Sequence, residues 1–330
     1  MKKYGIFCVA ILLKINAFAQ DFVFSQMQPN AALLNPAWQA NRSQPYQLSA
    51  QYRNQWSPVL GTAAYKTIAA SADAMFQLRR GNYWGGGIQF YQDQAGKMDF
   101  TQTQATISGF YSKFMMTSYG GKSQLRHYLT LGATFGFRQY RVDESKLHWV
   151  EQFEPSGVFN AGWAAPIYLE NNRKMVEEVH VGLLWHANNA EKEGFEVGLS
   201  LSHLTKPNLS MVAGGNVPLN RRFAIHGSAY HNLDKIQMKY HFAILQQGET
   251  RQTVLGLQIS TPFKKPSLKL GSGLAFRKSQ GVIGDAVIAT LNLDFQDYTI
   301  LMSYDWNIAW SEIKRWNHAI EMGFVYKIRN

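Results

Sequence analysis

Few residues of this 330-residue sequence are placed so that they could do chemistry together. Its nine histidines are scattered along the chain. The pairs His180 with His186 and His226 with His231 match neither the spacing of two that puts ligands on one strand face nor the helical spacing of four. Structural roles similar to those of aromatic residues explain these histidines better than metal ligation. We therefore expect no metal and no cofactor.

Signatures of enzymatic catalysis are also missing. The sequence has no G-x-S-x-G, H-E-x-x-H or Walker A pattern. Gly271-Ser272-Gly273 lies in a stretch of alternating apolar and polar residues, which favours close backbone packing over a phosphate loop. A Ser-His-acid triad is set by geometry and leaves no fixed spacing in a sequence. Nothing motivates one here, and we expect a protein without enzymatic activity.

Charged residues inside the alternating stretches are more informative. Four basic residues share a face with glycine or other small residues: Arg138, Lys269, Arg277 and Lys327. Three acidic residues in similar positions could pair with them: Glu196, Glu321 and Asp294. One interpretation is a network of internal salt bridges, because unpaired charges are costly away from bulk water. The other interpretation is a row of cations along a conduit.

The N-terminus has the pattern of a cleavable export signal. Lys2 and Lys3 precede the apolar stretch Tyr4–Leu13, and Ala17-Phe18-Ala19 has the small residues of a cleavage site. Cleavage near Ala19 would remove Cys8, the one cysteine of the sequence. The mature chain would then have no thiol for a disulfide, a thiolate metal site or a nucleophile.

Composition and charge narrow the class of protein further. The formal net charge is +11, but lysine and arginine are dispersed, which speaks against a nucleic-acid-binding surface. Such a charge suits anionic lipid headgroups or an acidic partner. No stretch after the signal approaches 18 apolar residues, so helical spans are not expected. Export, 14% aromatic residues and abundant glycine match a membrane barrel, in which only alternate residues need to be apolar.

Period-two alternation after Gln47 is the main structural pattern. From Tyr128 to Arg138, leucine, alanine and phenylalanine alternate with small or polar residues, and a similar pattern runs from Ala319 to Ile328. Fourteen strands are predicted to begin near residues 46, 67, 82, 100, 127, 178, 195, 221, 236, 251, 267, 285, 298 and 317. The predicted fold class is all-β, a transmembrane antiparallel β-barrel of about 14 strands over residues 46–330.

An even strand count places both ends of the barrel in the periplasm. The two longest connections, Arg141–Glu177 and Lys206–Asn220, then fall outside the cell. Most periplasmic connections are tight, although Met115–Arg126 is long for a periplasmic turn. The stretch Phe159–Leu169 contains Pro166 and little alternation, so we predict a loop there.

Residues 20–45, between the signal peptide (1–19) and the first strand, show no sustained period. Asn35-Pro36 and Gln44-Pro45 favour extended or turn conformations. One interpretation is a flexible periplasmic leader. The other is a plug inside the barrel, because Phe24 and Trp38 would otherwise be exposed to water.

Several stretches together resemble the PorP/SprF family of type IX secretion system membrane proteins. They are Asp21–Gln26, Leu34–Ala37, Tyr52–Trp56, Leu201–Asn208, Phe276-Arg277, Gly284–Ile288 and Ser303–Ile308. Their order along the chain is that of the family, and they cover nearly the whole mature chain. The residues singled out by this resemblance as family-motif or partner-binding candidates are Phe24, Ser25, Gln26, Asn35, Pro36, Arg53, Trp56, His203, Pro207, Arg277, Asp285, Tyr304 and Asp305.

The resemblance implies a non-enzymatic outer-membrane protein of type IX secretion or gliding motility. Family members are associated with the periplasmic secretion ring, or with the export and anchoring of a surface adhesin through its C-terminal domain. Expected partners are therefore such proteins and outer-membrane lipid, and no nucleic acid. The alternative is a channel or hydrophobic-solute transporter gated by the N-terminal segment. An outer-membrane hydrolase is a more distant third hypothesis.

Overall fold

The computed structural model describes residues 21–42, 44–96, 98–120, 123–154, 156–160, 162–163, 169–189, 193–233, 235–262, 268–280, 285–308 and 318–329. The predicted signal peptide, residues 1–19, and its cleavage site near Ala19 lie outside the described residues.

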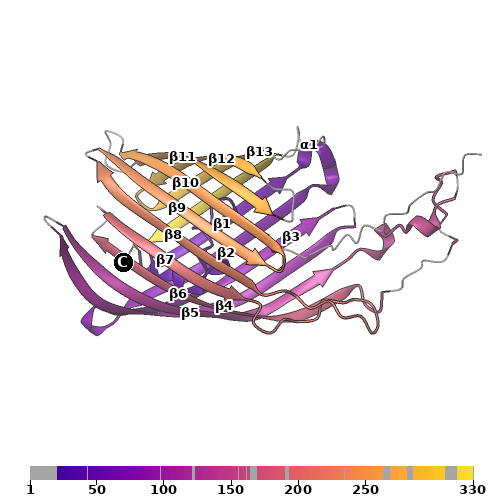
Figure 1. The fold of residues 1–330 in the computed structure, drawn as a ribbon, viewed down its shortest axis with the longest axis horizontal. Helices are drawn as coiled ribbons and strands as arrows, with labels where there is room; N and C mark the ends of the chain where they lie inside the picture. The colour runs from indigo at the N-terminus through magenta and orange to yellow at the C-terminus, as the bar shows by residue number, and fades with distance from the viewer. Residues whose placement is uncertain are drawn as a thin grey trace, which may run out of the picture.

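Fourteen antiparallel strands form one closed barrel, in which each strand pairs with its neighbours in sequence and β1 pairs with β14 (Figure 1). The strands are β1 (Tyr46–Gln55), β2 (Tyr65–Gln77), β3 (Tyr83–Ala95), β4 (Phe100–Gly120), β5 (Ser123–Arg141), β6 (Arg173–Asn189), β7 (Glu193–Ser202), β8 (Arg222–Leu233), β9 (Ile236–Gln247), β10 (Thr250–Pro262), β11 (Leu268–Gln280), β12 (Ala286–Phe295), β13 (Tyr298–Asn307) and β14 (Ala319–Ile328). The predicted fold class and strand count are confirmed.

The two faces of the strands separate apolar from polar side chains, as the alternation predicts. On β5, Leu131 and Phe135 are exposed on the outside, whereas Thr130, Thr134 and Arg138 are buried on the inside. An apolar outer face and a polar inner face are typical of barrels surrounded by lipid. Among the described residues, no helix is both long and apolar enough to cross a membrane.

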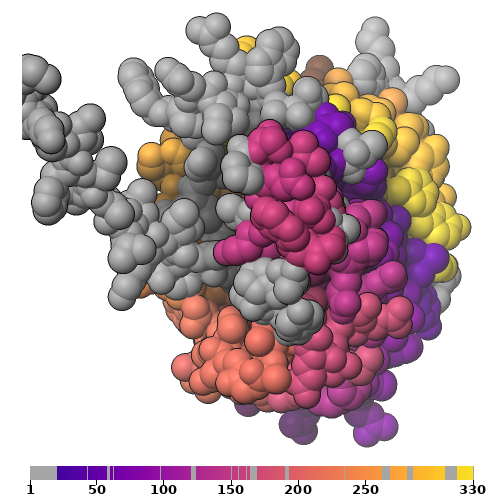
Figure 2. Space-filling model, turned by 90° about the vertical axis from the view of Figure 1, so that its right-hand side faces the viewer, coloured from indigo at the N-terminus to yellow at the C-terminus, as the bar shows by residue number. Residues whose placement is uncertain are grey.

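The two ends of the barrel differ in their connections (Figure 1). We call the end at which β1 begins and β14 finishes the turn end; there β12 and β13, for example, are separated only by Gln296 and Asp297. We call the opposite end the loop end. It carries the β5–β6 connection, residues 142–172, and the β7–β8 connection, residues 203–221, which are the two long connections predicted to be extracellular. Figure 2 looks onto the loop end, where the magenta atoms of the β5–β6 connection lie across the middle of the face.

The prediction of a long turn at Met115–Arg126 was wrong. Both strands continue into this stretch, since β4 ends at Gly120 and β5 begins at Ser123. A β-bulge between Phe114 and Met116 shifts the register and breaks the period-two pattern, so the sequence reads as a loop. In the Phe159–Leu169 stretch, the described residues form no strand beyond an isolated bridge from Phe159 to Phe153.

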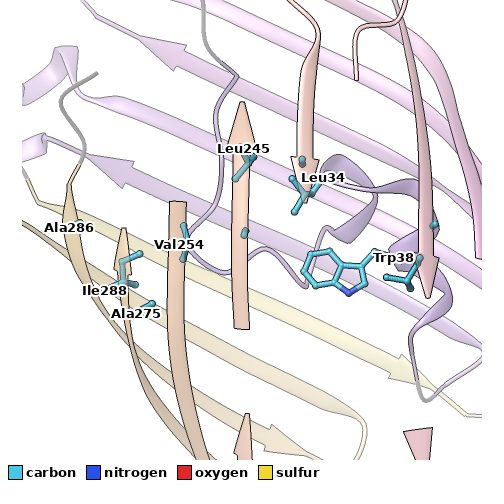
Figure 3. Close-up of a cluster of buried hydrophobic side chains, with 11 residues drawn as sticks. Leu34, Trp38, Leu245, Val254, Ala275, Ala286 and Ile288 are labelled. Atoms are coloured by element: carbon cyan, nitrogen blue, oxygen red, sulfur yellow. The ribbon is translucent and has the colours of Figure 1, made fainter. Parts of the chain in front are cut away.

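Among the described residues, the helical structure outside the barrel strands consists of short turns. They are η1 (Ala31–Leu33), η2 (Pro36–Ala40), α1 (Ser57–Leu60), η3 (Gly61–Ala63), η4 (Arg79–Gly81), η5 (Glu144–Lys146) and η6 (Val150–Gln152). The first two belong to residues 21–42, which we call the lumen segment because they lie against the inner faces of the strands. Leu34 and Trp38 of this segment join a buried cluster with Leu245, Val254 and Ile288 of the barrel (Figure 3). The core of the molecule is therefore built around the lumen segment.

Candidate functional site in the barrel lumen

The centre of the lumen segment is shaped by Asn35 and Pro36. Asn35 has extended backbone angles (φ −148°, ψ 113°), as the residue before a proline favours. Its side-chain Oδ1 accepts a 3.0 Å hydrogen bond from the Ala37 N–H and so caps η2, while Pro36 occupies the first position of that turn. Asn35 is fully buried, so the local capping residue is also in contact with the barrel wall.

Asn35 also binds three strands of the wall. Its Nδ2 lies 3.2 Å from the Leu183 carbonyl oxygen on β6, 3.3 Å from the Leu199 carbonyl oxygen on β7 and 2.9 Å from His226 Nε2 on β8. A buried amide that satisfies both its donor and its acceptor stabilises one specific position of the segment.

Glycines in the wall make this close approach possible. Gly132 on β5 and Gly182 on β6 are direct cross-strand neighbours beneath the segment. A Cβ at Gly132 would lie 2.6 Å from the Pro36 carbonyl carbon, and a Cβ at Gly182 would lie 2.9 Å from Asn35 Cγ. Contacts between carbon atoms are normally about 3.5–4.0 Å, so only glycine leaves room for the Asn35-Pro36 backbone.

Trp38 fixes the next turn of the segment. Its indole Nε1 donates a 2.9 Å hydrogen bond to Glu196 Oε2 on β7, and its ring lies 4.2 Å from the ring of His226. Glu196 also accepts hydrogen bonds from Asn41 and Ser228. Glu196, which was predicted to face inward, is therefore buried, and its carboxylate accepts hydrogen bonds from neutral donors of the segment and the wall. No ion pair of Glu196 occurs among the described residues.

A first charge cluster binds the backbone of the segment at Ser25 and Gln26. The N–H groups of these residues donate to the two carboxylate oxygens of Glu321, at 2.8 and 3.0 Å. Arg53 pairs with Glu321 at 3.2 Å and with Asp305 at 2.8 Å. All three charged side chains are at most 3% exposed. Because a buried charge without a partner is costly, each of them depends on the other two for its stability in the folded protein.

Arg277 and the Ser25 hydroxyl complete this cluster. Arg277 Nη1 lies 2.8 Å from Asp305 Oδ2, and Ser25 Oγ donates to the same oxygen at 2.7 Å. The cluster therefore joins β1, β11, β13 and β14 to the N-terminal segment. Salt bridges are the correct interpretation for Arg277, and Lys327 pairs with Asp294 at 2.6 Å as predicted. Glu321 pairs with Arg53 on the neighbouring β1, a residue that was not among the basic residues expected in the salt-bridge network.

A second charge cluster binds Asp21 on the opposite side of the lumen. Asp21 pairs with Arg138 at 2.7 Å, Arg222 at 3.0 Å and His203 Nε2 at 2.5 Å. Glu178 contacts Arg138 Nε at 2.8 Å and His203 Nδ1 at 2.7 Å. The imidazole of His203 is therefore held between two carboxylates, and it is completely buried.

The charges in the second cluster determine the ionisation of Asp21 and His203, the two members that lie outside the strands. Burial disfavours the charged form of Asp21, but Arg138, His203 and Arg222 outweigh it and hold the pKa of the carboxyl well below its usual value. Burial likewise lowers the pKa of His203, but the Asp21 charge and the hydrogen bonds to both carboxylates outweigh it, and the net shift is upward. An imidazolium with both N–H groups donating fits this arrangement.

The same cluster contains the one group of described residues with metal-ligand geometry, Glu178, His180 and His203. Their ligand atoms lie within 4.8 Å of one another. A metal needs a lone pair on one imidazole nitrogen, whereas both nitrogens of His203 face carboxylates, and two arginines add positive charge. These residues fit an ion-pair network and do not fit a cation site. Sequence spacing does not reveal this group, because Glu178 lies on β6 whereas His203 directly follows the end of β7.

Comparisons with known proteins agree with the fold and give the family. The family model described as "Type IX secretion system membrane protein PorP/SprF" matches residues 16–325. The chain belongs to this family. A search of curated protein sequences gives no significant match.

The solved structures similar to this PorP/SprF protein include a toluene transporter and a hydrocarbon channel. The Pseudomonas putida toluene transporter TodX aligns with a TM-score of 0.52 at 11% identity, over 94% of this chain and 98% of that one. The deltaS2S3 mutant of TodX, described as a monoaromatic hydrocarbon channel, aligns with a TM-score of 0.50 at 10% identity, over 90% and 93%. Identities this low show a shared fold. The chain is an outer-membrane β-barrel of the type IX secretion family.

The residues that carry the PorP/SprF resemblance divide into two sets in space. Those inside the barrel are Phe24, Ser25, Gln26, Asn35, Pro36, Arg53, His203, Arg277 and Asp305. Phe24 packs with Ala69 and Tyr91. These side chains therefore meet around the lumen segment, where they bind one another.

The second set lies at the loop end or on the outer face. Trp56 has a positive φ of 66° and is the N-cap residue that precedes α1, with its ring 5.0 Å from that of Tyr65. Pro207 accepts a hydrogen bond from the Leu219 N–H within the β7–β8 connection. Asp285 accepts bonds from Lys278 and the Ser279 N–H, and Tyr304 is 41% exposed on the outer face of β13. These four residues do not join the lumen clusters.

Proposed function

We propose that this protein is a closed, non-enzymatic barrel of type IX secretion or gliding that binds another protein of that system. The proposed partner at the loop end, which we take as extracellular, is the C-terminal domain of a secreted surface adhesin. The periplasmic secretion ring is the alternative partner, at the turn end. Membership of the PorP/SprF family supports a protein partner within type IX secretion.

The observation that carries this proposal is the exposure of large apolar side chains on the long loop-end connections. Val158 and Trp163 of the β5–β6 connection are 58% and 43% exposed, and Val217 of the β7–β8 connection is 54% exposed. Loops on the water side of the barrel have no lipid to cover such groups, so a protein surface is a suitable cover. The two connections are joined by a 2.9 Å hydrogen bond from the Glu170 N–H to the Met211 carbonyl oxygen.

The β5–β6 connection is also bound to the short β3–β4 connection. The Asp143 N–H donates to the Met98 carbonyl oxygen at 3.1 Å, and Lys146 pairs with Asp99. Several loops thus present a common, cross-linked face instead of independent strings. Such ordering lowers the entropic cost of binding a partner.

Affinity purification from native outer membranes tests the proposal. We expect the barrel to recover an exported surface protein or a ring component. The variant Val158→Ser, Trp163→Ser, Val217→Ser should reduce recovery by at least about tenfold, because apolar anchors dominate interface energies. Glu144→Ser with Glu151→Ser, which changes exposed polar positions of the same connection, is the control. Recovery of the barrel alone in mild detergent would contradict the proposal.

The transport hypothesis requires the lumen segment to move. The Asn35 contacts and both charge clusters oppose that movement, which favours a closed barrel. Planar-bilayer conductance of the protein lacking residues 20–45 separates the two functions. Conductance that appears only in the protein without this segment would support transport, whereas a barrel that stays closed after the deletion would refute it. Hydrolysis of lipid or peptide substrates by the purified protein would contradict the non-enzymatic assignment.

A further inference from the structure

The β4–β5 hairpin projects beyond its neighbours at the turn end, at the left of Figure 1. The pairing of β4 with β3 ends at Ser112, which is opposite Tyr83, whereas its pairing with β5 continues to Gly120. The Phe114 N–H is bonded to the Asn82 side chain. Met115–Gly120 is therefore a strand segment that pairs with β5 on one side and with no described strand on the other.

Apolar side chains are exposed on this projecting segment. Met115, Met116 and Tyr119 are 51%, 56% and 75% exposed. These residues follow Ser112, the last residue of β4 that pairs with β3, so β3 does not flank them. An exposed strand edge with apolar side chains invites pairing with another chain, and proteins usually blunt such edges.

Cations surround the free edge. Arg79 and Arg80 are exposed in the η4 turn between β2 and β3. Arg126 on β5 reaches across the hairpin, with its guanidinium 5.3 Å from the Phe114 ring centre and next to Gly81. None of these three arginines has an ion pair with a described residue. Three like charges at one edge repel one another and would be stabilised by an acidic ligand.

The inner side of the hairpin forms one wall of a cavity of about 990 Å³ that is also cationic. Arg126 lines it together with Arg42 and Lys239, and none of its described lining residues is Asp or Glu. The Nη1 and Nη2 atoms of Arg42 are shielded from water without a hydrogen-bond partner in the described chain. Arg42 Nε donates to the Gln39 carbonyl oxygen at 2.6 Å, so the two Nη atoms are the part of the guanidinium without acceptors. Buried donors without acceptors are costly, so an anion that enters this cavity and accepts from them would be bound favourably.

We propose that the turn end is a receptor for an extended, acidic segment of a periplasmic polypeptide. The segment pairs through its backbone with Met115–Gly120, and its carboxylates contact Arg79, Arg80 and Arg126 at the mouth of the cavity. Backbone pairing favours a polypeptide over a lipid headgroup, which could satisfy the arginines and leave the strand edge open. This inference deepens the proposed function, because it states the chemistry of the partner on the periplasmic side.

Peptide binding to the full mature protein in lipid nanodiscs tests the inference. The probe is a fluorescent peptide of alternating valine and glutamate. One comparison peptide has glutamine in place of glutamate, and a second is N-methylated at alternate residues, which removes backbone donors and keeps the charge. We expect saturable binding of the acidic peptide and at least about tenfold weaker binding of both comparison peptides. Equal binding of either comparison peptide, or no saturable binding, overturns the proposal.

Charge-neutral variants locate the site. Arg79→Gln, Arg80→Gln, Arg126→Gln together should weaken the acidic peptide by tenfold or more. Arg141→Gln, Arg173→Gln, Arg251→Gln, which removes three exposed arginines at the loop end, should not. Equal weakening by both triple variants would indicate attraction to net charge and would refute a turn-end site. Capture of an exported protein by the loop end is measured separately, so its loss refutes the proposed loop-end partner without altering this result.

Discussion

Gly182→Ala should release the centre of the lumen segment without opening the barrel wall. The new methyl carbon would lie 2.9 Å from Asn35 Cγ and 3.1 Å from Pro36 Cδ, inside normal carbon contact distances, so Asn35 must move. Movement sacrifices its bonds to the wall and its cap on the Ala37 N–H. Two donated bonds and one accepted bond at about 1 kcal/mol each amount to about 3 kcal/mol of local stability.

Hydrogen exchange of the backbone amides in residues 31–41 measures this loss. A decrease of about 3 kcal/mol in the opening free energy corresponds to roughly 100-fold faster exchange. The amides in the strands should keep their protection, since their pairing does not involve Asn35. Asn35→Ala removes the same bonds without adding an atom to the wall, and it should increase the exchange rate of these amides by a similar factor.

Gly109→Ala is the matched control, because it makes the same substitution in a strand. The nearest atom to a Cβ at Gly109 is the Gly85 carbonyl oxygen at 3.9 Å, so no group has to move. Unchanged exchange of residues 31–41 in Gly182→Ala would refute the role assigned to the glycines. Equal acceleration in Gly109→Ala would refute it as well, since the effect would then be general to the barrel.

Two further perturbations test the charge clusters. Arg53→Gln should lower the free energy of unfolding, measured by urea titration, by about 3–5 kcal/mol, because it leaves Asp305 and Glu321 buried with one cation fewer. Lys278 is 66% exposed, so the control Lys278→Gln should lower the free energy of unfolding by less than about 1 kcal/mol. His203 is surrounded by Asp21, Glu178, Arg138, Arg222 and His180, and its pKa is raised in the folded protein. Protonated His203 therefore stabilises the bound segment, and this contribution is fully present below the pKa of a free histidine, about 6.5. It is lost as the pH rises through the pKa of His203 in the folded protein. Proteolysis of residues 21–42 should therefore accelerate with rising pH in the wild type, and a His203→Gln variant that keeps the same pH dependence would contradict this assignment.

The sequence predicts the strands well because lipid on one side and a polar interior on the other impose alternation on almost every strand. Predicted starts at residues 46, 100, 236 and 298 coincide with β1, β4, β9 and β13. Starts were placed too late for β5 and β6, which begin at Ser123 and Arg173. The exposed residues at the start of β6 include the charged Arg173 and Glu177, so apolar alternation is absent there, and the bulge at Phe114 hides the end of β4.

The contents of the lumen were less accessible to sequence reasoning. Arg53 and Glu321 are direct neighbours only because β1 closes on β14, 268 residues later in the chain. Asp21 joins Arg138 and His203 only because residues 21–42 lie inside the barrel. The alternation reports which face a side chain occupies but carries no information on which inward groups meet, since that depends on register and closure.

The placement of the family-motif residues bears on where the proposed partners could be recognised. Arg53, His203 and Asn35 are each at most 2% exposed and are occupied by bonds to the lumen segment or its neighbours. A partner outside the barrel cannot touch them while the segment remains bound. They therefore stabilise the internal architecture of the barrel. Under the proposed function, discrimination between partners is expected at exposed positions such as Val158 and Trp163 at the loop end or Met115–Gly120 at the turn end.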